Sequence, residues 1–162
     1  MSDAKTPAPN GESADDAIPD WHHLPANPWN PHAWVLGSPD VGEGCWIGAF
    51  SLLDGSGGLT IGANTDISSG AQIYTHSTVR RAISDGRSGI ERAATSIGEH
   101  VHIGAGAIVL MGCDIGHHSV VGAGAVVRQH TIVPPWSLVV GTPARVIKDG
   151  AVQFGELREE AA

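Results

Sequence analysis

The histidines of this chain are well suited to chemistry near neutral pH, because an imidazole can accept a proton or bind a metal ion. Nine of the 162 residues are histidine. His76 stands in the stretch 73–86, IYTHSTVRRAISDG, where an otherwise regular pattern of aliphatic residues stops. His100 and His118 are eighteen residues apart. What these residues do depends on the elements that position them.

A six-residue repeat organises most of the chain. Aliphatic residues recur at every sixth position from Ile97 to Val139, followed by glycine in half of the units, with a small or slender residue in fifth place. The same register holds at Ile61, Ile67 and Ile73. A period of six suits neither an amphipathic helix nor a long strand, whereas it suits a coil with three short sides per turn. The repeat therefore predicts an all-β fold, a β-helix whose coils stack at about 4.8 Å.

An upstream run with the same spacing, Val41, Ile47 and Leu53, is two residues out of phase. The insertion DGSGGLT at 54–60 is expected to absorb this slip as a bulge or a widened corner.

Composition excludes several classes of protein. The net charge of −8 argues against a nucleic-acid partner, which requires a basic face. We expect no membrane span and, because the N-terminus lacks the layout of a signal peptide, a cytoplasmic location. Cys45 and Cys113 both fall on the fifth position of the repeat, so we interpret them as core residues and not as redox or metal thiols.

The chain divides into three parts on composition. Residues 1–20 lack apolar periodicity and are interpreted as a disordered tail. Residues 21–148 form the β-helix domain, and residues 149–162 form a C-terminal tail or short helix with Phe154 and Leu157 as its large apolar residues.

Three segments carry a family resemblance: IGANTDISSGAQIYTH, IGEHVHIGAGAIVLMGCDIGHHSVVGAGAVV and VPPWSLVVGTPARVI. They resemble the hexapeptide-repeat acyltransferases with a left-handed parallel β-helix, and are most similar to the maltose, galactoside and xenobiotic O-acetyltransferases. The resemblance covers about Val41 to Lys148. It implies a homotrimer, acetyl-CoA as co-substrate in grooves between neighbouring β-helices, and a sugar or nucleotide-sugar acceptor. No metal is expected, because only two histidines are aligned as potential ligands.

The same resemblance assigns His76 as the general base, next to an extruded loop at about 77–95. An imidazole would take the proton of the acceptor hydroxyl or amine as it attacks the thioester. The carboxylate that orients the second ring nitrogen stays open among four candidates: Asp54, Asp66, Asp85 and Glu91. The three aspartates, together with Trp136, are also candidates for contacting the acceptor.

The resemblance further assigns cofactor-binding positions. Ala105 and Ala123 match positions whose backbone contacts pantetheine. Basic and polar residues for the phosphate groups match the last coils: Arg128, Gln129, Arg145 and Lys148. Trp136 either flanks the adenine or caps the last coil.

Two alternatives remain open on sequence. One is a trimer similar to the γ-type carbonic anhydrases, with an interfacial histidine metal site to which His100 and His118 would contribute. A catalytic zinc usually needs three protein ligands, and these two histidines supply only two. The other is a β-helix that keeps the fold without the activity.

Overall fold

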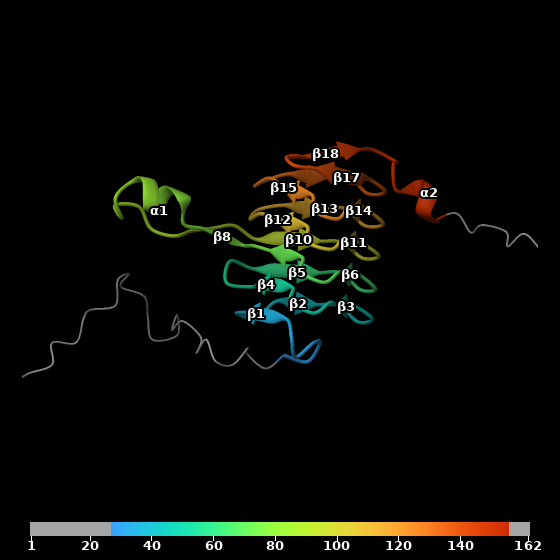
Figure 1. The fold of residues 1–162 in the computed structure, drawn as a ribbon, viewed down its shortest axis with the longest axis horizontal. Helices are drawn as coiled ribbons and strands as arrows, with labels where there is room; N and C mark the ends of the chain where they lie inside the picture. The colour runs from blue at the N-terminus through green and yellow to red at the C-terminus, as the bar shows by residue number, and fades with distance from the viewer. Residues whose placement is uncertain (1–26, 156–162) are drawn as a thin grey trace, which may run out of the picture.

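The computed structural model describes residues 27–155. The predicted tail at 1–20, the start of the domain at 21 and the end of the chain at 156–162 lie outside the described residues. Short strands form a stack of triangular coils that rises from β1 to β18, with one loop projecting from its side and α2 beyond its last coils (Figure 1). The predicted left-handed parallel β-helix is confirmed.

Three sheets form the walls of the β-helix, and each coil contributes one strand to each wall. The first sheet contains β1 (Trp34–Leu36), β4 (Leu52–Asp54), β7 (Gln72–Ile73), β12 (Ile108–Val109) and β15 (Val126–Val127). The second contains β2 (Asp40–Val41), β5 (Leu59–Ile61), β10 (Thr95–Ile97), β13 (Asp114–Ile115) and β16 (Ile132–Val133). The third contains β3 (Trp46–Ile47), β6 (Asp66–Ile67), β11 (His102–Ile103), β14 (Val120–Val121), β17 (Leu138–Gly141) and β18 (Ala144–Ile147).

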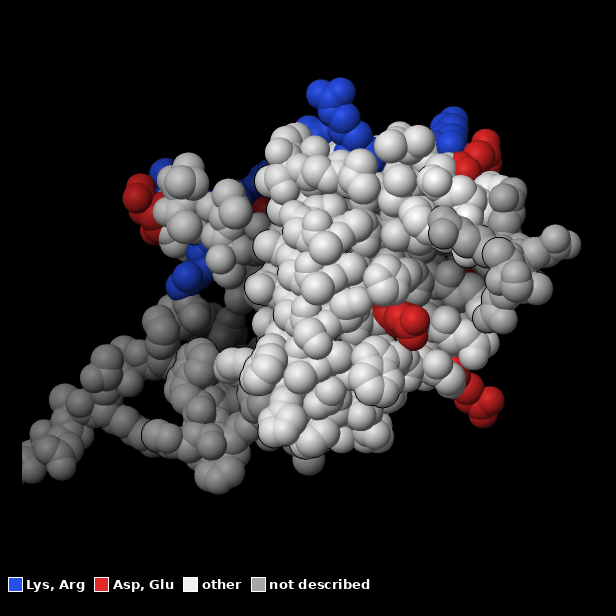
Figure 2. Space-filling view, turned by 45° about the vertical axis from the view of Figure 1, so that its right-hand side comes forward, with Lys and Arg blue, Asp and Glu red and all other residues white. Residues whose placement is uncertain are grey.

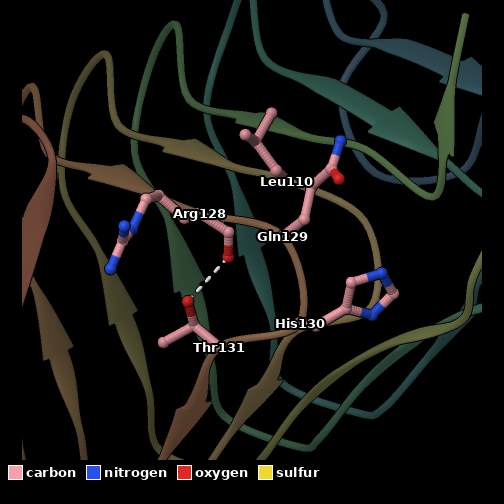
Figure 3. Close-up of a pocket in the computed structure, with 5 residues that line it drawn as sticks. All are labelled: Leu110, Arg128, Gln129, His130 and Thr131. Atoms are coloured by element: carbon pink, nitrogen blue, oxygen red, sulfur yellow. Dashed lines mark hydrogen bonds between the residues drawn. The ribbon is translucent and has the colours of Figure 1, made fainter. Parts of the chain in front are cut away.

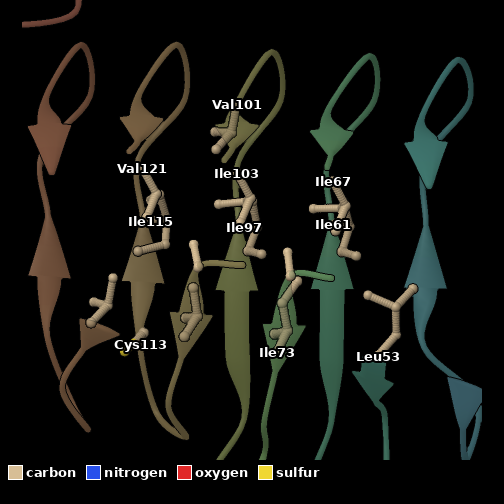
Figure 4. Close-up of a cluster of buried hydrophobic side chains, with 14 of the residues drawn as sticks. Leu53, Ile61, Ile67, Ile73, Ile97, Val101, Ile103, Cys113, Ile115 and Val121 are labelled. Carbon is tan, nitrogen blue, oxygen red and sulfur yellow. The ribbon is translucent and has the colours of Figure 1, made fainter. Parts of the chain in front are cut away.

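The repeat sets the register of these parallel strands. In the third sheet, for example, Ile67 pairs with Ile103, and Ile103 with Val121. Their side chains stack inside the triangle and are fully buried (Figure 4). Burying one such aliphatic side chain contributes about 1.5 to 3 kcal/mol to folding. The core is therefore a set of aliphatic ladders along the axis, as the six-residue spacing predicts.

The predicted slip lies where the sequence analysis expects it. Leu53 pairs with Ile73, twenty residues on, whereas Val109 pairs with Val127, eighteen residues on. The two extra residues widen the corner at 55–58, where the Gly58 N–H donates to the Gly55 carbonyl at 3.1 Å. Gly57 is required at this corner, because an added Cβ would lie 2.3 Å from the Thr75 carbonyl oxygen.

The fifth positions are mostly interior. Cys113 is 1% exposed, and burial raises the pKa of its thiol. Cys45 is half-buried, with its Sγ 3.1 Å from the Gly62 carbonyl oxygen. Pro143 departs from the pattern and is exposed, because β17 turns back into an antiparallel pair with β18 and ends the coil.

Beyond this antiparallel pair, the predicted short C-terminal helix is present as α2 (Val152–Gly155). Phe154 is 62% exposed, and Leu157 lies outside the described residues. No helix between residues 27 and 155 has the length and apolar character needed to cross a bilayer.

Candidate active site

The chain leaves the β-helix directly after β7, at the corner between the first and second sheets. Thr75 anchors the exit and is fully buried. Its N–H donates to Asp54 Oδ2 at 2.8 Å, and its hydroxyl donates to the Asp54 carbonyl oxygen at 2.8 Å. The same hydroxyl accepts the Gly57 N–H at 2.8 Å. The widened corner and the exit are therefore held together by hydrogen bonds, which fixes the next residue, His76.

His76 and Asp54 form the central pair of the site. The Nδ1 atom of His76 lies 2.5 Å from Asp54 Oδ2, and the side chains are 30% and 0% exposed, respectively. Burial by itself would raise the pKa of Asp54. Hydrogen bonds from the Ser56 side chain, the Thr75 and Ser56 backbone and the His76 ring outweigh it, and lower that pKa from 3.8 to about 2. Asp54 is therefore ionised at neutral pH.

This ionisation decides which ring nitrogen can act as a base. A carboxylate only accepts hydrogen bonds, so Nδ1 of His76 must carry the proton that lies between the two groups. In the neutral ring, Nε2 then holds the free lone pair. Among the described residues Nε2 has no hydrogen-bond partner. The pair thus presents a proton acceptor at the root of the loop.

Of the four carboxylates that sequence left open, Asp54 is the one that orients His76. Its complete burial makes it a poor candidate for contacting an acceptor. Asp66 lies exposed on the outer face of the third sheet, paired with His102. Asp85 is an exposed loop residue 3.7 Å from Arg87, and Glu91 pairs with Arg80 at 3.2 Å.

The loop is a small folded unit. Its base is an antiparallel pair of β8 (His76–Ser77) and β9 (Glu91–Arg92), and α1 (Val79–Ile83) lies at its outer end. The chain re-enters the second sheet at β10, so the loop spans about 77–94, close to its predicted bounds. In Figure 2 the loop projects from the largely uncharged coil wall and carries charges of both signs.

Two cavities flank this corner. One, of about 540 Å³, lies against the loop and is lined by Ser77, Val79, Arg80, Ile83, Ser84, Arg87, Glu91 and Gln129. The other, of about 490 Å³, lies on the coils above and is lined by Leu110, Arg128, Gln129, His130 and Thr131 (Figure 3). Gln129 belongs to both linings, so the two cavities adjoin.

The cofactor candidates fall on two different corners of the triangle. Ala105 and Ala123 are exposed at the corner that precedes the strands of the first sheet, whereas Arg128 and Gln129 follow those strands. An added Cβ at the neighbouring Gly106 or Gly124 would meet no atom within 4 Å, so the first corner offers an open, shallow wall. Arg145 and Lys148 lie on and just after β18. Within one chain, only Arg128 and Gln129 share a corner with His76.

Trp136 stands at the third corner, between the second and third sheets. Its ring stacks on His118 with centroids 4.4 Å apart, and His118 lies 4.8 Å from His100. These rings form a column along the corner, because His100, His118 and Trp136 are each eighteen residues, or one coil, apart. Trp136 also accepts the Ala151 N–H on its carbonyl oxygen at 3.0 Å, so it packs between the histidine column and the C-terminal segment. This arrangement favours the capping interpretation.

The metal alternative gains no support from the geometry. Between residues 27 and 155 no three histidine, cysteine, aspartate or glutamate residues lie together as potential ligands.

Sequence reasoning did not single out the loop arginines. Arg80 and Arg87 line the cavity against the loop, whereas the sequence pattern shows them only as polar loop residues. The sequence did contain a signal for the position of Asp54. Asp54 directly follows the core residue Leu53, and the pairing of Leu53 with Ile73 places Asp54 close to where the loop leaves the coil.

Comparison with known proteins supports this description. Residues 94–129 match the family model for the bacterial transferase hexapeptide with six repeats. No curated protein matches the chain. Residues 94–129 thus carry the hexapeptide repeat, and the predicted resemblance is confirmed.

Several solved structures are similar. A hexapeptide-repeat acetyltransferase from Vibrio cholerae O1 biovar eltor, complexed with acetyl coenzyme A, is 34% identical with a TM-score of 0.58, over 68% of this chain and 59% of that one. A maltose O-acetyltransferase from Clostridium difficile 630 is 30% identical with a TM-score of 0.54, over 72% of this chain and 65% of that one. The chain therefore spans less than two thirds of either protein.

A third structure shares the fold at lower identity. It is a variant of AntD, an N-acyltransferase from Bacillus cereus, in complex with dTDP-4-amino-4,6-dideoxyglucose and coenzyme A. The identity is 24% and the TM-score 0.64, over 74% of this chain and 67% of that one.

Proposed function

We propose that the protein is an acyltransferase that moves an acetyl group from acetyl-CoA to a hydroxyl or amine of a sugar or nucleotide-sugar acceptor. The observation that carries the proposal is the Asp54–His76 pair, 2.5 Å apart at the root of the extruded loop. The similarity to hexapeptide-repeat acetyltransferases supplies the reaction class. We place the reaction in the cytoplasm, where acetyl-CoA is available.

The proposed reaction is a direct transfer. His76 Nε2 takes the proton of the acceptor as its oxygen or nitrogen attacks the thioester carbonyl. A carbon–oxygen or carbon–nitrogen bond forms, the carbon–sulfur bond breaks, and the imidazolium returns the proton to the departing CoA sulfur. Asp54 keeps Nδ1 protonated and stabilises the imidazolium while it exists. No covalent acyl-enzyme is needed, because the thioester is already reactive.

We propose that the active unit is a homotrimer, in which one subunit supplies the Ala105 and Ala123 corner and its neighbour supplies His76. The separation of these residues within one chain supports this arrangement. The outer face of the first sheet, which lies between the two corners, carries mainly apolar half-buried side chains, namely Trp34, Leu52, Ile108 and Val126, together with Gln72. The corresponding outer face of the second sheet carries mainly exposed polar residues: Asp40, Thr60, Ser96 and Asp114. An apolar outer face is the one expected to be covered by another subunit.

The decisive experiment is titration of acetyl-CoA into the wild type, His76→Ala and Asp54→Asn by calorimetry, followed by turnover with an acceptor panel. All three proteins should bind acetyl-CoA with similar Kd, because neither residue is assigned to the cofactor. His76→Ala should lower kcat on the order of 10²- to 10⁴-fold, the usual contribution of a general base.

Asp54→Asn provides a second readout on the same mechanism. An asparagine amide can donate to Nδ1 and so select the wrong tautomer, which should lower kcat without a matching rise in KM. Absence of acetyl-CoA binding by the wild type would refute the proposed function. Full turnover by His76→Ala would refute the role of the histidine.

A further inference from the structure

The cavity beside the loop contains two arginines that the reaction outlined above does not use. Arg80 lies on α1 and Arg87 on the turn that follows it, and both line the same cavity of about 540 Å³. Ser77, the residue next to His76, lines it as well. The cavity therefore lies against the strand that carries the proposed base.

Both guanidinium groups keep donors available for a ligand. Nε of Arg80 lies 3.2 Å from Glu91 Oε1 in an ion pair, and Arg87 donates its Nε to the Ser84 carbonyl oxygen at 2.8 Å. Nη2 of Arg87 is 3.7 Å from Asp85, beyond hydrogen-bond range. A guanidinium has five N–H donors in a planar fork. The described residues provide no further hydrogen-bond partner for the terminal nitrogens of either side chain.

The charge of this cavity contrasts with the rest of the molecule. Its lining holds two arginines against one acid, Glu91, in a chain whose net charge is −8. The ion pair between Arg80 and Glu91 is made through Nε, on the side of the guanidinium away from its terminal nitrogens. Two forks of this kind are suited to a phosphate group, which accepts paired hydrogen bonds from arginine. Val79 and Ile83, 64% and 82% exposed, add an apolar wall against which a sugar or base can pack.

The position of Gln129 connects this cavity to the cofactor side. It lines both the loop cavity and the cavity that contains Arg128. Two substrates bound in adjoining cavities lie side by side, which suits a direct transfer between them. The arginines of the loop therefore lie on the acceptor side of this wall, and the Arg128 cavity on the cofactor side.

We infer that the acceptor carries a phosphate group, a sugar phosphate or a nucleotide sugar, which the guanidinium groups of Arg80 and Arg87 bind in the loop cavity. This inference rests on the proposed acetyltransferase function and specifies its acceptor.

The test is calorimetric binding in the presence of saturating CoA, so that sites for the cofactor's own phosphates are filled. The probes are glucose 1-phosphate, UDP-glucose and, as the uncharged reference, glucose. The proteins are the wild type, the double variant Arg80→Gln/Arg87→Gln, and Arg81→Gln as the matched control, since Arg81 is on the same helix but outside the cavity lining. Each protein is also titrated with acetyl-CoA alone.

We expect at least one phosphorylated probe to bind the wild type at least tenfold more tightly than glucose. The double variant should lose that preference at least tenfold while keeping its Kd for acetyl-CoA, and Arg81→Gln should behave as the wild type. Tighter binding of glucose 1-phosphate would identify the acceptor as a phosphate monoester, and tighter binding of UDP-glucose would identify it as a nucleotide sugar.

Three results would overturn the inference: equal or no binding of the phosphorylated probes relative to glucose, an unchanged preference in the double variant, or a loss of acetyl-CoA affinity in the double variant. The last result would assign the arginines to the cofactor. A wild type that does not bind acetyl-CoA would instead refute the proposed function itself, which separates the two failures.

Discussion

At the scale of single residues, the site depends on one buried carboxylate. Asp54 is completely buried, receives hydrogen bonds from Thr75, Ser56 and His76, and has its pKa lowered to about 2. The same hydrogen bonds serve two purposes. They set the tautomer of His76, and they fasten the widened corner to the coil above it.

The lowered pKa of Asp54 predicts how the free energy of unfolding changes at acid pH. A carboxylate whose pKa is lower in the folded state stabilises the fold above its unfolded pKa, and that contribution is lost as pH falls toward the folded pKa. For Asp54 the shift from 3.8 to about 2 corresponds to about 2 kcal/mol. The free energy of unfolding of the wild type should therefore fall by about that amount between about pH 4 and pH 2.

The measurement is urea unfolding across this pH range, with Asp54→Asn as the reference. Asparagine does not titrate, so the variant should be less stable at neutral pH but should show a shallower decline toward pH 2. Parallel declines in the two proteins would show that Asp54 is not the group responsible.

At the scale of elements, the coil is held by ladders of aliphatic residues, and each rung contacts mainly its two neighbours. Ile103 in β11 lies between Ile67 and Val121 and is fully buried. The adjacent His102 points outward on the same strand and is exposed. Two neighbouring residues thus experience opposite environments, as the twofold alternation of a strand requires.

We predict that Ile103→Asp destabilises the protein by at least about 3 kcal/mol, because it places an unpaired charge in a dry interior. His102→Asp is the matched control. It places the same side chain outside, opposite Asp66, at a cost of no more than about 1 kcal/mol. Circular dichroism during thermal unfolding measures both variants. A soluble Ile103→Asp protein with near wild-type Tm would contradict the register of the core.

At the scale of the whole molecule, the candidate residues are distributed over the three corners of the triangular β-helix, and each corner carries a different group of them. The corner where the loop leaves the coil carries His76, the proposed base, and a second corner carries Ala105 and Ala123, the proposed pantetheine contacts. The third corner carries the column of His100, His118 and Trp136. The apolar outer face of the first sheet joins the first two corners. This distribution suits a site shared between copies of the chain.

We therefore predict a trimeric mass in solution, and dissociation when a charge is placed on that face. Ile108→Glu on the outer face of the first sheet should yield monomers with intact secondary structure. Ser96→Glu on the outer face of the second sheet should remain trimeric. Light scattering coupled to size-exclusion chromatography distinguishes these outcomes, and a monomeric wild type would refute the shared site.

The sequence by itself determined the architecture, because a six-residue period with glycine and small residues at fixed places is compatible with few folds other than stacked three-sided coils. It also located the slip at 54–60, the loop after His76 and the short C-terminal helix. These features follow from local spacing, which one chain displays directly.

Only the tertiary structure selected Asp54 from four carboxylates, because that choice depends on which residues meet across coils separated by about twenty positions in sequence. It also placed Arg80 and Arg87 in one cavity beside Ser77, and put Ala105 and His76 on different corners. Loop conformation and the superposition of coils decide such contacts. They arise from packing between distant segments, and the periodicity of the sequence does not encode them.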